Sequence, residues 1–278
     1  MTIDVDAVLV ASSERVPAPA GRASGNLLAP FTPWLSTLAI LLLWTAVSAG
    51  GLIGPRALPS PFDVLAAAWE LTANGRLPAA LVASLARVLA GTALGLVLGL
   101  GAGLLAGYYR VGEMVVDRPL QMLRAVPFNA LVPLFIVAFG IGELMKVSLI
   151  AVGVLVPIYL NTFAGVRNVD SKLVEVGLVY RVPQRLIASK ILFLGALPSI
   201  LTGLRFSLAI AWIALVTSET VNTNAGVGYI LAQAQRFVRT DQVFLCIVIY
   251  ALLGILTDYL VRRLEGRLLA WRKSYDGR

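Results

Sequence analysis

Long apolar runs separated by short polar connections dominate the pattern along this chain. A helix needs about 20 apolar residues to cross the hydrocarbon core of a bilayer. By this measure the pattern predicts six spanning helices, in the ranges 33–54, 84–108, 126–142, 145–166, 195–218 and 242–262. The third range is short, and Pro133 within it should distort the helix, so neighbouring helices must satisfy the freed backbone groups.

Composition supports a membrane protein and gives little support to an enzyme. Of the 278 residues 58% are hydrophobic and 14% are charged, and the mean hydropathy is +0.84, whereas soluble domains carry about 25% charged residues. The chain has no histidine, which removes the usual proton shuttle, and its one cysteine, Cys246, has no partner. It also has no GxxxxGK[ST] phosphate-binding loop. We therefore expect an all-α integral membrane protein without catalytic residues, cofactor or metal of its own.

Lysine and arginine positions predict the orientation of the spans. Of the 23 basic residues, 16 fall in the N-terminal tail, after the second and fourth ranges and after the sixth, and five fall in the other connections. Connections rich in Lys and Arg stay in the cytoplasm. Both termini should therefore be cytoplasmic, and the net charge of +8 marks the inner face, so nucleic acid is an unneeded partner.

The same pattern divides the chain into parts. We expect a flexible cytoplasmic tail at 1–32, a six-helix membrane domain at 33–266 with a charged cytoplasmic insert at 170–191, and a cytoplasmic tail at 267–278. The outer connection 55–83 should hold a surface helix, with Ser60 as N-cap and Pro61 at its first position. Residues 219–241 should form a turn and a short helix at the outer surface.

Glycines recur at every fourth position of the second range. Such a ridge lets another helix approach closely, because packing rather than the hydrophobic effect holds helices together in lipid. The predicted packing residues are Gly91, Gly95, Gly99, Gly103 and Gly107.

Charges within apolar spans suggest function by default, because they are costly there. Arg205 and Asp258 either pair or reach towards the inner surface, or Arg205 lies beside the route of an anion. Glu219 either lines a pathway or belongs to the structure of the outer loop. The candidate residues of a translocation path are Asn129, Arg205, Thr217, Ser218 and Glu219.

The insert should fold into two short helices. Asp170 can N-cap the first, from 171 to about 180, and Pro183 can open the second. Leu173, Val176 and Tyr180 recur at three- and four-residue spacing. Such an amphipathic helix suits either docking in the groove of a partner or lying on lipid headgroups, and the residues alone do not separate the two.

A known family pattern coincides with this insert. The residues are similar to the EAA motif, E-A-A-x3-G-x9-I-x-L-P, of permeases from binding-protein-dependent ABC importers. Glu175 matches, Val176 and Gly177 stand for the two alanines, and Arg181 stands for the glycine between the two helices, where Pro183 can end the first helix instead. The Leu-Pro pair is at 197–198.

The resemblance covers about residues 35–272 and implies a type I importer permease (MetI-like) fold. The phrases PIYLNT, GVRNVD and TSET are similar to those of the subfamily for aliphatic sulfonates, taurine and nitrate, and especially of the sulfonate permeases. The family implies a bacterial inner-membrane homodimer, two cytoplasmic ATPases that bind ATP and Mg, and an extracytoplasmic binding protein. It also implies that the insert couples to the ATPase through Leu173, Glu175, Val176, Gly177, Tyr180, Arg181 and Pro183. A secondary transporter is the alternative class.

Overall fold

The computed structural model describes residues 32–51, 54, 57–221 and 223–270. The expected tails at 1–32 and 267–278 lie largely outside these residues. The described part is helical, in two units that we treat separately, Met1–Val47 and Ser48–Arg278. The first unit contains most of α2 (Thr32–Ala49). The second contains α3 (Pro61–Ala73), α4 (Arg76–Tyr108), α5 (Arg110–Gly112), η1 (Glu113–Asp117), α6 (Arg118–Ala125), α7 (Phe128–Phe139), α8 (Glu143–Arg167), α9 (Ser171–Val179), α10 (Gln184–Leu186), η2 (Ile187–Leu192), α11 (Phe193–Thr220), α12 (Val227–Arg236) and α13 (Thr240–Leu268).

Four helices in the described residues are long and apolar enough to cross a membrane. They are α4, α8, the continuous helix Gln184–Thr220 and α13, and a bent helix pair makes a fifth if it is counted as one span. The predicted second, fourth, fifth and sixth ranges fall within these four helices. Near the first range, the apolar helix Leu35–Ala49 is shorter than a full span. The chain is thus a multi-pass membrane protein.

The third predicted span differs from the expectation. In place of one helix over 126–142 there is the 12-residue helix α7, which follows Arg110–Ala125 at an angle of 110°. The break is at Val126, whose backbone is extended (φ −74°, ψ 126°) because the ring of Pro127 disfavours helical geometry in the preceding residue. Pro133, expected to cause the distortion, lies inside α7. A proline therefore interrupts this range, as expected, but the break is at Pro127 and not at Pro133.

The predicted surface helix forms with its predicted cap. Ser60 caps α3, Pro61 is its first residue, and Asp63 completes a capping box with Ser60. The Ser60 hydroxyl donates to the Asp63 carboxylate at 2.7 Å and the Ser60 backbone N–H at 2.9 Å. Both bonds favour the ionised carboxylate and lower the pKa of Asp63.

The glycine ridge of α4 faces α8. A β-carbon added at Gly95 would lie 2.5 Å from the backbone oxygen of Ala151 and 2.7 Å from Cβ of Val154, closer than real side-chain contacts. The other four glycines meet α8 in the same way, at Ile150, Ile158, Thr162 and Val166. The four-residue spacing therefore places one backbone directly against another, the close approach expected from the sequence.

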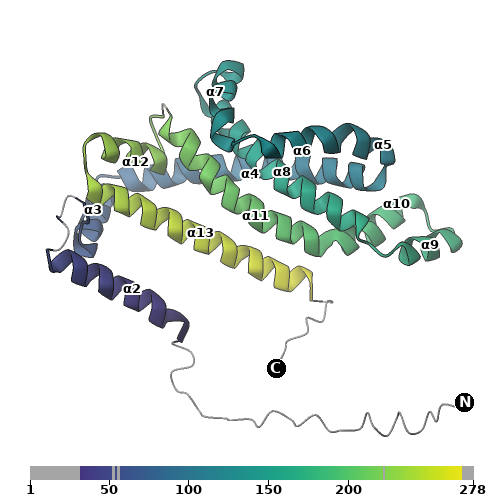
Figure 1. Ribbon diagram of the computed structural model, residues 1–278, viewed down its shortest axis with the longest axis horizontal. Helices are drawn as coiled ribbons and strands as arrows, with labels where there is room; N and C mark the ends of the chain where they lie inside the picture. Colours follow the sequence, from purple (N-terminus) through teal and green to yellow (C-terminus); the bar gives the residue numbers. More distant parts are fainter. Residues whose placement is uncertain (1–31, 52–53, 55–56, 222, 271–278) are drawn as a thin grey trace, which may run out of the picture. The chain divides into compact units, whose positions relative to one another are not determined.

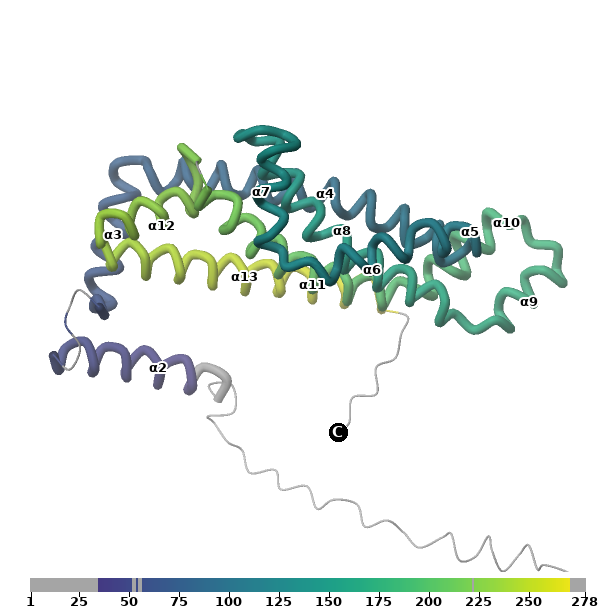
Figure 2. The backbone as a smooth tube through the Cα atoms, turned by 45° about the horizontal axis from the view of Figure 1, so that its top comes forward, coloured from purple at the N-terminus to yellow at the C-terminus, as the bar shows by residue number. Residues whose placement is uncertain are grey.

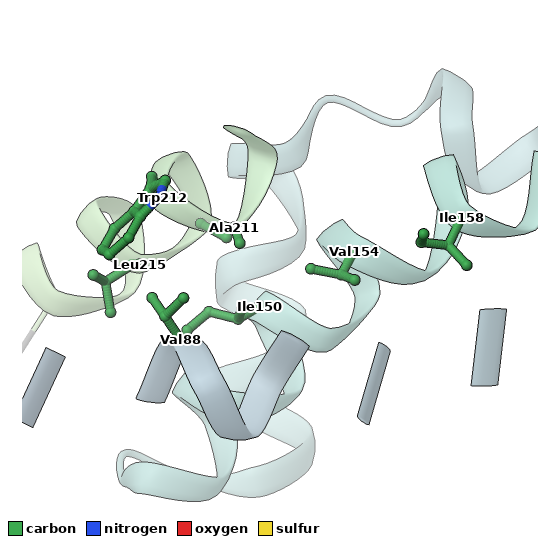
Figure 3. Packing of buried hydrophobic residues seen from close by; sticks show 8 residues of the cluster. Val88, Ile150, Val154, Ile158, Ala211, Trp212 and Leu215 are labelled. Atoms are coloured by element: carbon green, nitrogen blue, oxygen red, sulfur yellow. The ribbon is translucent and has the colours of Figure 1, made fainter. Parts of the chain in front are cut away.

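The apolar core lies where α4, α8 and α11 meet. Figure 3 shows Val88 of α4 beside Ile150 of α8 and Leu215 of α11. Its buried members are Val88, Ile150, Val154, Ile158, Ala211, Trp212, Ala214 and Leu215. Because lipid is as apolar as these side chains, close packing rather than burial from water holds the three helices together here as a rigid frame.

Short helices lie at both ends of the second unit. One end, which we call the α12 end, contains α3 and α12, which contact α4 and α13 (Figures 1 and 2). The opposite end, the α9 end, contains α9 and α10, beyond the end of α8 and the start of α11 (Figure 1). The two ends carry the candidate sites.

Candidate functional site

At the α9 end, the chain between α8 and α11 folds as two short helices. The Asp170 carboxylate accepts a hydrogen bond from the Lys172 backbone N–H at 2.9 Å and caps α9. Pro183 precedes α10, which continues through the π-helical turn η2 into α11. Both features were predicted, and the second helix of the insert is therefore the start of the 37-residue helix Gln184–Thr220.

Arg181 keeps the turn that the motif glycine would make. Its φ is 53°, in the left-handed region that favours glycine. The Arg181 N–H donates to the carbonyl of Leu178 at 3.0 Å, and the Val182 N–H donates to that of Gly177 at 2.9 Å. These two bonds form a Schellman motif, which ends a helix sharply. The turn survives the replacement of glycine at a cost of about 1–2 kcal/mol.

This turn gives a first testable prediction. Arg181→Gly should keep the turn and remove the strain, whereas Arg181→Val should open it, because a β-branched residue resists positive φ. We expect chymotrypsin to cut after the exposed Tyr180 several-fold faster in the valine variant than in the original protein, and no faster in the glycine variant. Equal cleavage of both variants would contradict the role of φ at this position.

Helix α9 turns one side inward and leaves an apolar surface outside. Val174 packs against a buried cluster at the start of α11, and the buried Gly177 lies against Ile187 and Ile191. The predicted row of Leu173, Val176 and Tyr180 is 56%, 54% and 78% exposed. Glu175, Arg181 and Pro183 are exposed as well. Two further exposed residues, Leu178 and Val179, extend the apolar surface.

At the α12 end, an ionic cluster around the buried Arg87 and Glu219 joins three long helices, and the side chain of its third member, Glu143, is 62% exposed. Arg87 of α4 is 6% exposed. Its guanidinium binds Glu143 of α8 through two nitrogens, at 2.6 and 2.7 Å, and Glu219 of α11 at 2.6 Å. Lys146 lies 3.0 Å from Glu143. Two cations and two carboxylates therefore balance in charge, as a buried cluster requires.

Glu219 also holds the loop that leads to α12. Its carboxylate is 1% exposed and accepts from the Ser84 hydroxyl at 2.8 Å and from the Gly228 N–H at 2.8 Å. Gly226 passes so close that an added β-carbon would lie 2.4 Å from this carboxylate. Arg87 completes the attachment by donating to the Ala225 carbonyl at 2.7 Å. These contacts are those that an outer-loop role of Glu219 requires. Arg87 was not among the candidate residues predicted from the sequence.

Arg205 is engaged by acidic residues of α13. Its guanidinium lies 3.3 Å from Asp258 and 2.7 Å from Glu265. The pairing with Asp258 is the simpler of the two interpretations considered from the sequence. Ser218 is buried and, like Thr217, donates its hydroxyl to a carbonyl of its own helix, while Asn129 is exposed on α7. The five expected path residues are thus not brought together, and their role in a pathway stays a prediction.

A hollow of about 600 Å³ opens between α6, α7, α8 and α11. Its lining residues are Leu123, Arg124, Val126, Phe128, Leu131, Val152, Gly153, Val156, Pro157, Leu160, Asn161, Phe206, Ile210 and Ile213. Among these described residues only Arg124 is charged, and none of the five expected path residues is present. A small ligand needs such a concave, mostly apolar site with a few polar groups.

The buried helices, the insert and the hollow define a membrane permease, and comparison with known proteins identifies its family. Residues 91–270 match the family described as the binding-protein-dependent transport system inner membrane component. The chain belongs to this family. Its members are the non-catalytic membrane subunits of ABC transporters, in which a separate subunit hydrolyses ATP.

Individual relatives narrow the class. Two proteins named as aliphatic sulfonates transport permease SsuC are similar over most of the chain. The one from Bacillus subtilis (strain 168) is 43% identical over 86% of both chains, and that of Escherichia coli (strain K12) is 42% identical over 87% of this chain and 92% of its own. The taurine transport system permease protein TauC of Escherichia coli (strain K12) is 31% identical over 85% and 88%.

A solved structure supports the fold alone. The MetNI methionine ABC transporter in an inward-facing conformation matches with a TM-score of 0.51 at 20% identity, over 65% of this chain and 92% of that one. The expected MetI-like arrangement therefore has a structural neighbour.

Proposed function

We propose that this chain is the permease subunit of an ATP-driven importer for aliphatic sulfonates. The identity of 42–43% to two sulfonate permeases, over 86–87% of the chain, is the observation that carries the choice of substrate. Taurine is the alternative that the more distant relative favours, and nitrate or another small anion follows from the subfamily resemblance. A secondary transporter is less favoured, because it gives the exposed apolar surface of α9 no partner.

The proposed assembly follows the family. Two copies of the permease form a homodimer in the bacterial inner membrane, with six spans per copy and both termini in the cytoplasm. Two cytoplasmic ATPase subunits bind ATP and Mg, and an extracytoplasmic binding protein delivers the substrate to the α12 end. The predominance of Lys and Arg in the connections at the α9 end supports this orientation.

Coupling would run through α9. Its exposed apolar side is suited to a groove on the ATPase, as an amphipathic helix is to a partner's hydrophobic groove. The base of the insert continues without a break into the 37-residue helix Gln184–Thr220. A displacement of α9 on ATPase closure would therefore reach the α12 end through one rigid element. Two packings that differ by a few kcal/mol suffice for such alternation.

Uptake into proteoliposomes tests this proposal. With the ATPase enclosed and the binding protein outside, a labelled alkanesulfonate should accumulate only when ATP is enclosed as well. The matched control is an ATPase in which the lysine of its phosphate-binding loop is replaced. Accumulation without ATP would instead identify a secondary transporter. ATP-dependent accumulation of labelled taurine or nitrate, but not of the labelled alkanesulfonate, would identify a different substrate.

A further inference from the structure

Three arginines in the helices that could cross a membrane, Arg87, Arg205 and the exposed Arg124, differ in their partners. Arg87 binds two carboxylates, Glu143 and Glu219, and Arg205 binds Asp258 and Glu265. No carboxylate among the described residues lies within ion-pair distance of Arg124. An ionisable side chain within a membrane span is costly and normally has a partner or a pathway beside it. Arg124 has a hollow beside it.

Two contacts with α8 give the depth of Arg124. Before it, Asp117 accepts a hydrogen bond from Tyr159 at 3.0 Å. After it, the Phe128 ring lies 3.2 Å from the position of a β-carbon on Gly153. Because Tyr159 and Gly153 both lie in the middle part of α8, Arg124 lies there as well. The count of basic residues had placed Arg124 in an inner connection, whereas the bent helix pair Arg110–Ala125 and Phe128–Phe139, a span if it is counted as one, includes it.

The chemistry of the hollow fits an anion with an apolar tail. Arg124 supplies its one charge, and Asn161 supplies an amide whose nitrogen donates to the Pro157 carbonyl at 2.9 Å, so that its oxygen position is fixed. The rest of the lining is aliphatic or aromatic apart from Gly153 and Pro157. A guanidinium binds the oxygens of a sulfonate group through charge-assisted hydrogen bonds, and the apolar walls suit an alkyl chain.

We propose that Arg124 is the anion-binding residue of a substrate site in this hollow, with the sulfonate group at Arg124 and the alkyl chain against the apolar lining. This inference rests on the proposed import of sulfonates. Arg124 replaces Arg205 as the candidate anion-binding residue, because Arg205 already pairs with two carboxylates. The guanidinium of Arg124 would also attract inorganic sulfate. The experiment must therefore distinguish an alkanesulfonate, which has an alkyl chain, from sulfate, which has none.

Charged thiol reagents test the site without relying on transport. Ile213 lines the hollow and is 58% exposed, and Cys246 is buried and is the one cysteine of the chain. In the complex with its ATPase, Cys246→Ala with Ile213→Cys should react faster with an anionic than with a cationic methanethiosulfonate. Adding Arg124→Gln should lower this anion-to-cation rate ratio about tenfold, because one nearby positive charge is lost. Adding Arg118→Gln, which is exposed in the same helix but does not line the hollow, should leave it unchanged.

Protection and uptake complete the test. Alkanesulfonates should slow the anionic reagent, more strongly as the chain lengthens, whereas sulfate at the same concentration should do so weakly. Arg124→Gln should lower ATP-dependent uptake at least tenfold, with Arg124→Lys between it and the original protein. An unchanged rate ratio or normal uptake in Arg124→Gln would overturn the proposal. Absence of sulfonate uptake in the original protein would overturn the proposed function instead, and the rate ratio would then decide whether the hollow binds anions.

Discussion

Arg87→Leu is expected to destabilise the protein by about 3–5 kcal/mol, because it leaves the buried Glu219 without its cation. The loss should appear as a large fall in the melting temperature of the purified permease in detergent. It should also free the loop at 223–228, which Arg87 and Glu219 attach to the helices, and so raise protease cleavage there. Of the substitutions proposed for this protein, Arg87→Leu should have the largest effect on stability.

Two controls separate the buried cluster from ordinary charge loss. Glu70→Gln removes an exposed ion pair with Arg239, 3.3 Å long, and should cost less than about 1 kcal/mol. The double variant Arg87→Leu with Glu219→Leu should recover part of the stability, because an apolar pair often replaces a buried ion pair at little cost. If Arg87→Leu melted at the same temperature as Glu70→Gln, the cluster would contribute no more to stability than an exposed ion pair does.

Deleting residues 172–182 should abolish co-purification of the ATPase while the permease still inserts into the membrane. The deletion removes the exposed apolar side of α9 but leaves the core of α4, α8 and α11 intact. A single substitution, Val176→Asp, should reduce recovery of the ATPase at least tenfold, because it places a charge in the centre of the docking surface. Recovery is measured as the ratio of ATPase to permease after affinity purification through the permease.

The control for this experiment is Ser171→Asp. It adds the same charge at the first residue of α9, where a carboxylate is favourable, and outside the row of Leu173, Val176 and Tyr180. Normal recovery of the ATPase with Ser171→Asp and loss with Val176→Asp would identify the apolar row as the contact. A stoichiometric ATPase with the deleted chain would show that α9 is not the coupling element.

Local features of this fold could be predicted from the sequence because they depend on near neighbours. Ser60 and Asp170 cap the helices that they were expected to cap, and the glycine spacing of α4 indicated a close helix contact. In the same way, Asp170 and Pro183 indicated where the two short helices of the insert begin. Hydropathy found the four long spans but placed the break in the third range at Pro133 rather than Pro127, because it cannot tell which of two prolines a helix tolerates.

Features that depend on distant residues were not predictable in this way. Arg87 meets Glu143 and Glu219, which are 56 and 132 residues away in the chain, so no local pattern pairs them. Arg124, expected in a connection, belongs to the helix Arg110–Ala125 that precedes the bend at Val126. It is therefore the arginine that lines the hollow. Arg205 was a candidate for contact with an anion from the sequence, but in the structure Asp258 and Glu265 of α13 pair with it.

The glycine contact between α4 and α8 limits how this protein can move. Backbone oxygens of α8 lie directly under Gly95 and Gly99, and the α8 side chains that meet the glycine ridge are all β-branched and therefore stiff at χ1, so the contact does not absorb a displacement by changing rotamers. The two helices form a single strut, and any rearrangement must rotate this strut as a whole. In the proposed alternation between inward- and outward-open states, movement is therefore expected at the joints that the frame of α4, α8 and α11 makes with α7 and α13. A bound anion at Arg124 would sit at one of these joints.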